Sequence, residues 1–132
     1  MIKMIAFDLI GVLCKKNEET DRYIIDKVKQ VCGNVKIVIA TNNYSLIRNF
    51  IEDTFNTENL DDIFISAEIN TSKPDTSFYE YILNKYNLKP HELLFIDDSQ
   101  MNVDSAKRLG INTIKINDGD DVYEKVVKFL GK

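Results

Sequence analysis

The chain has 132 residues, of which 44% are hydrophobic and 29% charged, a composition that is ordinary for a soluble globular protein with one core. Its formal charge of -4 at pH 7 lacks the basic excess that non-specific nucleic-acid binding requires, so no nucleic-acid partner is expected. Asp8 interrupts the apolar run near the N-terminus, so we expect no signal peptide, no membrane span and a cytoplasmic location. Cys14 and Cys32 lack metal-site spacing, which favours two reduced thiols over a disulfide.

The stretch Met4–Leu13 contains the first predicted strand and the first candidate catalytic residue. Its residues up to Phe7 are apolar or small, as is typical of a strand buried on both faces in a parallel sheet. Asp8 follows at once, and open α/β sheets place their ligands at the carboxyl ends of strands. Asp8 is therefore a candidate for chemistry, with capping of the next turn as the alternative.

A helix and a second strand follow in the chain. The helix is predicted from Glu18 to Gly33, because apolar residues recur at helical spacing there and glycine can end a helix. Val35–Ala40 is an apolar, β-branched run and predicts a second buried strand. Thr41-Asn42-Asn43 comes next and supplies good N-terminal caps for a following helix, whose first N–H groups would favour an anion beside Thr41.

The rest of the chain repeats this alternation. Strands are predicted at Asp62–Ser66, Leu93–Ile96 and Ile111–Ile116, the last nearer a sheet edge because its pattern alternates. Helices are predicted after Lys73-Pro74-Asp75, over Met101–Leu109 and at the C-terminal end around Val122, Val126 and Leu130. Such alternation requires crossover connections, so we expect one three-layer α/β domain over residues 1–132, with a mainly parallel five-stranded sheet.

Polar side chains stand at or just beyond the carboxyl ends of these strands: Asp8, Thr41, Lys73 and the pair Asp97-Asp98. In a parallel sheet those ends share one edge. Carboxylates gathered there would repel, by roughly 4 kcal/mol for two unit charges about 4 Å apart at an effective dielectric of ~20. A Mg²⁺ ion would remove this cost, and it also accepts phosphate oxygens. With a hydroxyl and an ammonium beside it, the set fits phosphoryl transfer.

Four segments resemble, in order, the four sequence signatures of the haloacid dehalogenase superfamily: Phe7–Leu13, Ile39–Asn42, Ser72–Asp75 and Phe95–Asn102. The likeness covers nearly the whole chain. Each segment alone is a weak signal, but their common order and spacing identify the chain as a member of the superfamily. The resemblance implies a Rossmann-like sheet and Mg²⁺-dependent chemistry through an aspartyl intermediate, here a phosphatase reaction through an aspartyl-phosphate.

The resemblance also assigns catalytic and substrate-binding roles to matched residues. Asp8 matches the nucleophilic aspartate, and Lys73 matches the lysine that steadies both the nucleophile and the transferring group. Thr41 matches the phosphate-binding residue, and Asn42 beside it is expected to bind substrate as well. The expected substrate is a phosphorylated molecule.

The metal ligands follow from the same comparison. Asp8 would also bind Mg²⁺, and Ile10 occupies the position whose backbone carbonyl is a ligand in the family. Asp98 matches the direct metal ligand of the last signature, while Asp97 and Asn102 match positions that hold the water shell of the metal.

Ile10 departs from the family pattern. Family phosphatases usually carry a second aspartate there, which protonates the leaving oxygen and later activates water. Isoleucine has no proton to give, and a positioned acid or base typically contributes ~10²–10⁴-fold to a rate. Two interpretations remain: a phosphohydrolase that uses Asp8, for which Glu18 or Glu19 is a conceivable replacement base, or a weak or inactive phosphate- and metal-binding regulatory module.

The spacing between the signatures leaves no room for a cap domain. The interval from Asp8 to Thr41 leaves room for one loop and one helix, and the interval from Thr41 to Lys73 is also too short for the other type of cap. We therefore expect an open site, which suits a macromolecular phosphorylated substrate or a second subunit acting as a lid in a homo-oligomer. A response-regulator receiver uses similar residues but places Lys-Pro last, so chain order argues against it.

Overall fold

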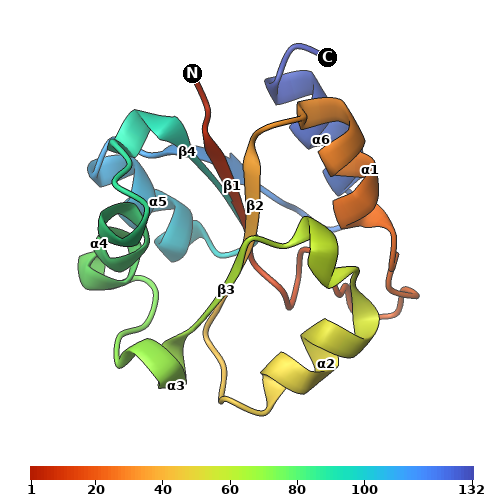
Figure 1. The fold of residues 1–132 in the computed structure, drawn as a ribbon, viewed down its shortest axis with the longest axis horizontal. Helices are drawn as coiled ribbons and strands as arrows, with labels where there is room; N and C mark the ends of the chain where they lie inside the picture. The colour runs from red at the N-terminus through yellow and green to blue at the C-terminus, as the bar shows by residue number, and fades with distance from the viewer.

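The computed structural model describes all 132 residues and shows a three-layer α/β fold around five parallel strands (Figure 1). The strand order is β3-β2-β1-β4-β5. The strands are β1 (Met4–Phe7), β2 (Lys36–Thr41), β3 (Asp62–Ile65), β4 (Leu93–Asp97) and β5 (Asn112–Lys115). The predicted five-stranded parallel sheet of Rossmann-like class is confirmed, and β5 lies at an edge as expected.

Helices cover both faces of the sheet. They are α1 (Ile24–Cys32), α2 (Ile47–Thr54), α3 (Ser66–Ile69), α4 (Thr76–Lys85), α5 (Gln100–Arg108) and α6 (Val122–Phe129), with 3₁₀ turns η1 (Thr57–Asn59) and η2 (Pro90–Glu92). In Figure 1, α1 and α6 lie on one side of the sheet and α4 and α5 on the other, while α2 and α3 lie at the end where the strands finish. No helix is long and apolar enough to span a bilayer.

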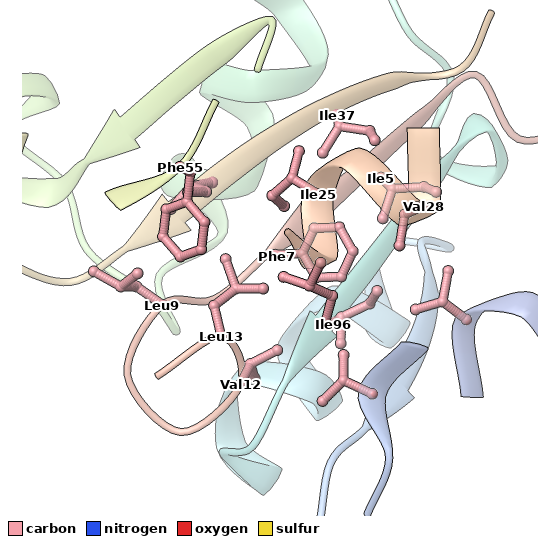
Figure 2. Close-up of a cluster of buried hydrophobic side chains, with 14 of the residues drawn as sticks. Ile5, Phe7, Leu9, Val12, Leu13, Ile25, Val28, Ile37, Phe55 and Ile96 are labelled. Atoms are coloured by element: carbon pink, nitrogen blue, oxygen red, sulfur yellow. The ribbon is translucent and has the colours of Figure 1, made fainter. Parts of the chain in front are cut away.

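The strands are apolar on both faces because each face packs against helices. Along β1, Ile5 and Phe7 enter one core cluster while Met4 and Ala6 enter the other, as the two-residue period of a strand requires. Figure 2 shows the first cluster, where Ile5, Phe7, Ile37 and Ile96 from the sheet meet Ile25 and Val28 of α1. The sheet is thereby rigidly held between layers, which fixes the positions of its strand ends.

Two local predictions were wrong. The helix predicted from Glu18 begins only at Ile24, because the residues between them are mainly exposed and offer no apolar face to pack. Thr41-Asn42-Asn43 does not cap α2, which begins at Ile47 without a side-chain cap. Instead, the Asn43 N–H donates to Ser66 Oγ at 2.9 Å, so this segment is tied to the start of α3, a short helix that the sequence pattern did not reveal.

Candidate active site

The strand order reverses at β1, with β2 and β3 on one side and β4 and β5 on the other, and open α/β sheets bind ligands at such a point. Asp8 follows β1, and its N–H donates to the Ile96 carbonyl of the neighbouring β4 at 2.9 Å. Asp97 ends β4, and Thr41 ends β2 on the other side of β1. The sheet register therefore brings three residues predicted for the site to one edge.

Lys73 reaches the same edge from the loop before α4. Its Nζ donates to Asp8 Oδ1 at 2.9 Å, to Asp97 Oδ2 at 2.8 Å and to the Ala40 carbonyl at 2.8 Å. The Lys73 side chain is 1% exposed, and Nζ lies 5.3 Å from the centre of the Phe95 ring. All three ammonium hydrogens are used, so Lys73 is a fixed buried charge that holds two carboxylates together.

The neighbours Asp97 and Asp98 have different environments. Asp97 is fully buried and accepts hydrogen bonds from Lys73 Nζ, from Asn102 Nδ2 at 3.1 Å and from the Ser99 N–H at 2.9 Å. Asp98 is exposed, and its carboxylate accepts no hydrogen bond from the protein. Asp97 is thus committed largely to protein donors, whereas Asp98 is free to meet a ligand.

The acidic residues have a geometry that suits a divalent cation. Asp8, Asp97 and Asp98 each offer an oxygen, and these oxygens all lie within 4.8 Å of one another. Three carboxylates beside the one ammonium of Lys73 leave two net negative charges, which a divalent cation would balance. Mg²⁺ takes a few carboxylate oxygens together with waters and phosphate oxygens. The donor set therefore fits Mg²⁺.

Gly11 is a site residue that the sequence analysis did not single out. Its φ is +97°, and a Cβ at this position would lie 2.2 Å from Asp98 Oδ2 and 2.5 Å from Asp98 Cγ. The Asp98 carboxylate therefore lies directly against the Gly11 backbone, where only glycine leaves room for it. The sequence signal for this constraint is a glycine three positions after the strand-end Asp8.

Gly11→Ala is therefore expected to displace Asp98 and weaken Mg²⁺ binding by about 10-fold or more, the scale on which metal sites respond to loss of support. The matched control is Gly33→Ala, because Gly33 also has a positive φ (+62°) but has no atom within 4 Å of the added Cβ. Both variants carry backbone strain of order 1–3 kcal/mol. The measurement is Mg²⁺ affinity by titration calorimetry, and equal affinities in the two variants would contradict the contact's role.

The phosphate-binding residues that the sequence predicted lie beside this cluster. The Thr41 hydroxyl, in a side chain that is almost fully buried, makes no hydrogen bond within the protein. The Asn42 side chain is committed to Lys73: its Nδ2 donates to the Lys73 carbonyl at 2.8 Å, and its Oδ1 accepts from the Lys73 N–H at 2.9 Å. The Asn42 backbone N–H has no partner. The free donors here are therefore the Thr41 hydroxyl and the Asn42 N–H.

Ile10 lies at the rim of the site, and its residue is 57% exposed. Together with Gly11 and Asp98 it lines a cavity of about 750 Å³. Glu18 lines the same cavity, whereas Glu19 does not. An apolar side chain thus faces this open, polar space.

Burial raises the pKa of Asp8 to about 7, against the opposing effect of the Lys73 ammonium and with a further contribution from the charge of Asp97. In the unfolded chain this carboxyl titrates near its ordinary value of 3.8. At pH values between these two pKa values, the Asp8 carboxyl is ionised in the unfolded chain but stays protonated in the folded protein. The contribution of Asp8 to stability therefore falls as pH rises from about 4 to about 7.

Asp8→Asn is accordingly expected to gain stability over the wild type across this window in the absence of divalent cations, by up to about 4 kcal/mol at pH 8. The measurement is the difference in the free energy of unfolding between the two proteins, from urea titrations between pH 4 and pH 8. Saturating Mg²⁺ should reverse the difference, because it binds the ionised carboxylate. A difference that does not change with pH would be evidence against the raised pKa.

The sequence and the fold of this chain are similar to those of known proteins. A sequence model of the haloacid dehalogenase-like hydrolase family matches residues 8–116. The structure of a predicted hydrolase of the same haloacid dehalogenase-like family from Porphyromonas gingivalis is similar with a TM-score of 0.84 at 18% identity, covering 100% of this chain and 99% of that one. A family enzyme from Bacteroides thetaiotaomicron, solved as a mutant with magnesium and inorganic phosphate, is similar with a TM-score of 0.77 at 17% identity. The match covers 92% of this chain and 97% of that one.

Three curated relatives match shorter stretches. A drimenol cyclase of Aspergillus calidoustus is 31% identical over 54% of this chain and 13% of its own length. An (S)-2-haloacid dehalogenase of Pseudomonas is 25% identical over 67% of this chain and 39% of its own length. A D-ribitol-5-phosphate phosphatase of Bacteroides thetaiotaomicron is 26% identical over 53% of this chain and 34% of its own length. The matched part of this chain thus spans less than half the length of each relative. Since these names describe different reactions, they do not define a substrate for this chain.

Proposed function

This chain belongs to the haloacid dehalogenase-like hydrolase family, and on that premise we propose that it is a Mg²⁺-dependent phosphohydrolase with Asp8 as its nucleophile. The observation that carries the proposal is the buried Lys73 ammonium, which joins Asp8 to Asp97 beside the free carboxylate of Asp98. The names of two relatives, a D-ribitol-5-phosphate phosphatase and a sesquiterpene phosphatase, support phosphate monoesters as the substrate class.

Asp8 would act by direct attack on phosphorus. Lys73 holds one oxygen of its carboxylate, and the other accepts no hydrogen bond from the protein, so a lone pair remains free for a substrate. This oxygen forms a bond to phosphorus while the bond from phosphorus to the leaving oxygen breaks, which gives an aspartyl-phosphate. Water then attacks the phosphorus and releases the Asp8 carboxylate.

The remaining residues would position the phosphoryl group. The Thr41 hydroxyl and the Asn42 N–H are free donors for its oxygens, and Lys73 supplies a positive charge next to the nucleophile. The Asn42 side chain would act indirectly, because it holds the Lys73 backbone in place. Asn42 is therefore proposed as a substrate ligand through its main chain and as a positioning residue through its amide.

Mg²⁺ would be held by Asp8 and Asp98, with the Ile10 carbonyl as a further ligand and with Asp97 and Asn102 supporting its water shell. When bound, the ion neutralises excess negative charge and withdraws electrons from the phosphoryl group. The structural neighbours solved with magnesium support this choice of metal.

We also propose that residues 1–132 act as a single hydrolase domain with an open site. The insertion between β3 and Lys73 amounts to the four-residue helix α3, and no helix or strand lies between β1 and α1. A macromolecular substrate, a homo-oligomeric lid and a cytoplasmic location stay predictions.

The test is an assay of p-nitrophenyl phosphate hydrolysis with and without divalent cations. Activity is expected to disappear on chelation and to return when Mg²⁺ is added back, because the carboxylate cluster needs a cation to accept a phosphate dianion. Calcium is the control, since its longer bonds and looser geometry fit poorly at a site for Mg²⁺. An absence of hydrolysis at every Mg²⁺ concentration would count against the proposal.

A second candidate function is favoured by Ile10, which removes the usual acid and base. In that case the protein binds phosphate and Mg²⁺ as a regulatory module and turns over little. Beryllofluoride with Mg²⁺, a mimic of the phosphorylated carboxylate, would then raise the melting temperature although hydrolysis stays at background.

A further inference from the structure

We propose that the phosphorylated form of Asp8 accumulates in this protein, and that its phosphoryl donors are acyl phosphates, whose leaving groups depart without needing a proton. This inference rests on the proposed function, because it requires Asp8 to be the nucleophile. It differs from that function in predicting a long-lived phosphoprotein and in naming acyl phosphates, rather than phosphate monoesters, as the favoured phosphoryl donors.

The first observation is the group that stands beside the nucleophile. Ile10 lies two residues after Asp8, at the rim of the site, and is 57% exposed. Its side chain can neither give nor accept a proton. It lines the 750 Å³ cavity next to Asp98, where it contributes hydrocarbon among mainly polar and charged residues.

The second observation is that no carboxyl group of the acidic cluster is free to substitute for the missing acid. The acidic cluster contains Asp8, Asp97 and Asp98 alone. Asp97 is fully buried and accepts three hydrogen bonds from the protein. The Lys73 ammonium donates all three of its hydrogens to protein acceptors. Asp98 is the carboxylate that remains free, and it is required for the metal.

The more distant ionisable groups lie outside this cluster. Glu18 and Asp118 line the cavity, but neither has an oxygen within 4.8 Å of both the Asp8 and the Asp98 carboxylates. His91, the single histidine, lies on η2 directly before β4 and therefore at the opposite end of the sheet from Asp97. Lys15 and Lys16 also line the cavity, but Lys15 already donates to the Asp120 carbonyl, and an ammonium has no free electron pair with which to act as the base in the second step. No carboxylate or imidazole is therefore positioned for proton transfer at the site.

The consequence for the first step concerns the leaving group. As Asp8 bonds to phosphorus, the bond to the leaving oxygen breaks and its electron pair stays on that oxygen. An alkoxide must then take up a proton, which no side chain supplies here. A carboxylate leaves as a stable anion at neutral pH, so an acyl phosphate satisfies the step without an acid.

The consequence for the second step concerns water. Its oxygen must bond to phosphorus and lose a proton while the bond to Asp8 breaks. Without a positioned base this step is expected to slow by ~10²–10⁴-fold relative to a site that has one. Phosphorylation is then faster than hydrolysis, and the Asp8 phosphate accumulates.

The experiment uses the full chain with acetyl phosphate and Mg²⁺, quenched in acid and measured by intact mass spectrometry. The wild type is expected to gain the mass of one phosphoryl group, and Asp8→Asn none. After removal of the donor, Ile10→Asp is expected to lose the phosphoryl group about 100-fold faster or more. Ile10→Asn is the matched control, because the asparagine side chain is polar and has nearly the shape of aspartate but is not a base. The lifetime of the phosphoryl group in this variant should stay close to that in the wild type.

A second readout compares donors with different leaving groups. For the wild type, the rate of Asp8 phosphorylation should fall steeply from acetyl phosphate to p-nitrophenyl phosphate to glycerol phosphate. Ile10→Asp should flatten this dependence, because an added acid protonates the poorer leaving groups.

Three results would overturn the inference. Rapid turnover of acetyl phosphate by the wild type without any accumulated adduct would reject it and leave the proposed function standing. A Glu18→Gln variant that lengthens the phosphoryl lifetime by 10-fold or more would show that Glu18 is the base. Absence of both adduct and turnover in the wild type and in Ile10→Asp would reject the proposed function together with the inference.

Discussion

Asp8→Asn is expected to lower the hydrolysis of p-nitrophenyl phosphate by about 10⁴-fold or more, the scale on which covalent enzymes lose activity without their nucleophile. The amide has nearly the shape of the carboxylate, and its oxygen can still accept the hydrogen bond that Lys73 donates to Asp8 Oδ1 at 2.9 Å. The geometry of the site is therefore expected to survive, and the loss reports chemistry. The measurement is kcat/KM, with circular dichroism to verify the fold.

Asp98→Asn serves as the control for that experiment. Asp98 is exposed and meets no protein donor, so its substitution should weaken metal binding without removing the nucleophile. We expect part of its lost activity to return at high Mg²⁺, whereas Asp8→Asn should not recover at any concentration. If Asp8→Asn retained most of the wild-type rate, Asp8 would not be the nucleophile.

Lys73→Met is expected to destabilise the metal-free protein by about 3–5 kcal/mol at pH 8, the range observed when one partner of a buried ion pair is removed. Methionine keeps the unbranched stem against Phe95 but removes the ammonium. Asp97, which is fully buried, and Asp8 then face each other without a neutralising charge. The measurement is the free energy of unfolding in urea.

Two further variants separate this effect from the loss of an ordinary ion pair. Lys85→Met removes the pair between Lys85 Nζ and Asp62 Oδ2, which are 2.6 Å apart, but the Lys85 side chain is 49% exposed. It should cost less than about 1 kcal/mol. Adding Asp97→Asn to Lys73→Met should recover part of the loss, because one of the unpaired charges is then gone. Similar costs for the two lysine variants would mean that burial of Lys73 is unimportant.

Part of the site can be predicted from the sequence because the patterns that mark its residues are local. Asp8, Thr41 and Asp97 each stand at the end of an apolar run, and parallel strands bring such ends to one edge whatever the details of packing. Lys73 was predicted from its place before a helix and from the family signature. Its complete burial, with all three hydrogens engaged, was not predicted.

By itself, the sequence determined the layer architecture and the family, because strand and helix periodicity and the order of four short signatures are properties of neighbouring residues. Only the tertiary structure decided that Asp97 accepts hydrogen bonds from protein donors whereas Asp98 stays free for a ligand. That difference depends on which of the two carboxylates faces Lys73 and Asn102. It also decided that Asp98 lies against Gly11 and that the Asn42 amide holds the Lys73 backbone. The contacts of Asp98 with Gly11 and of Asn42 with Lys73 join residues 31 or more positions apart, and pairings over that range are decided by packing, which local sequence patterns do not encode.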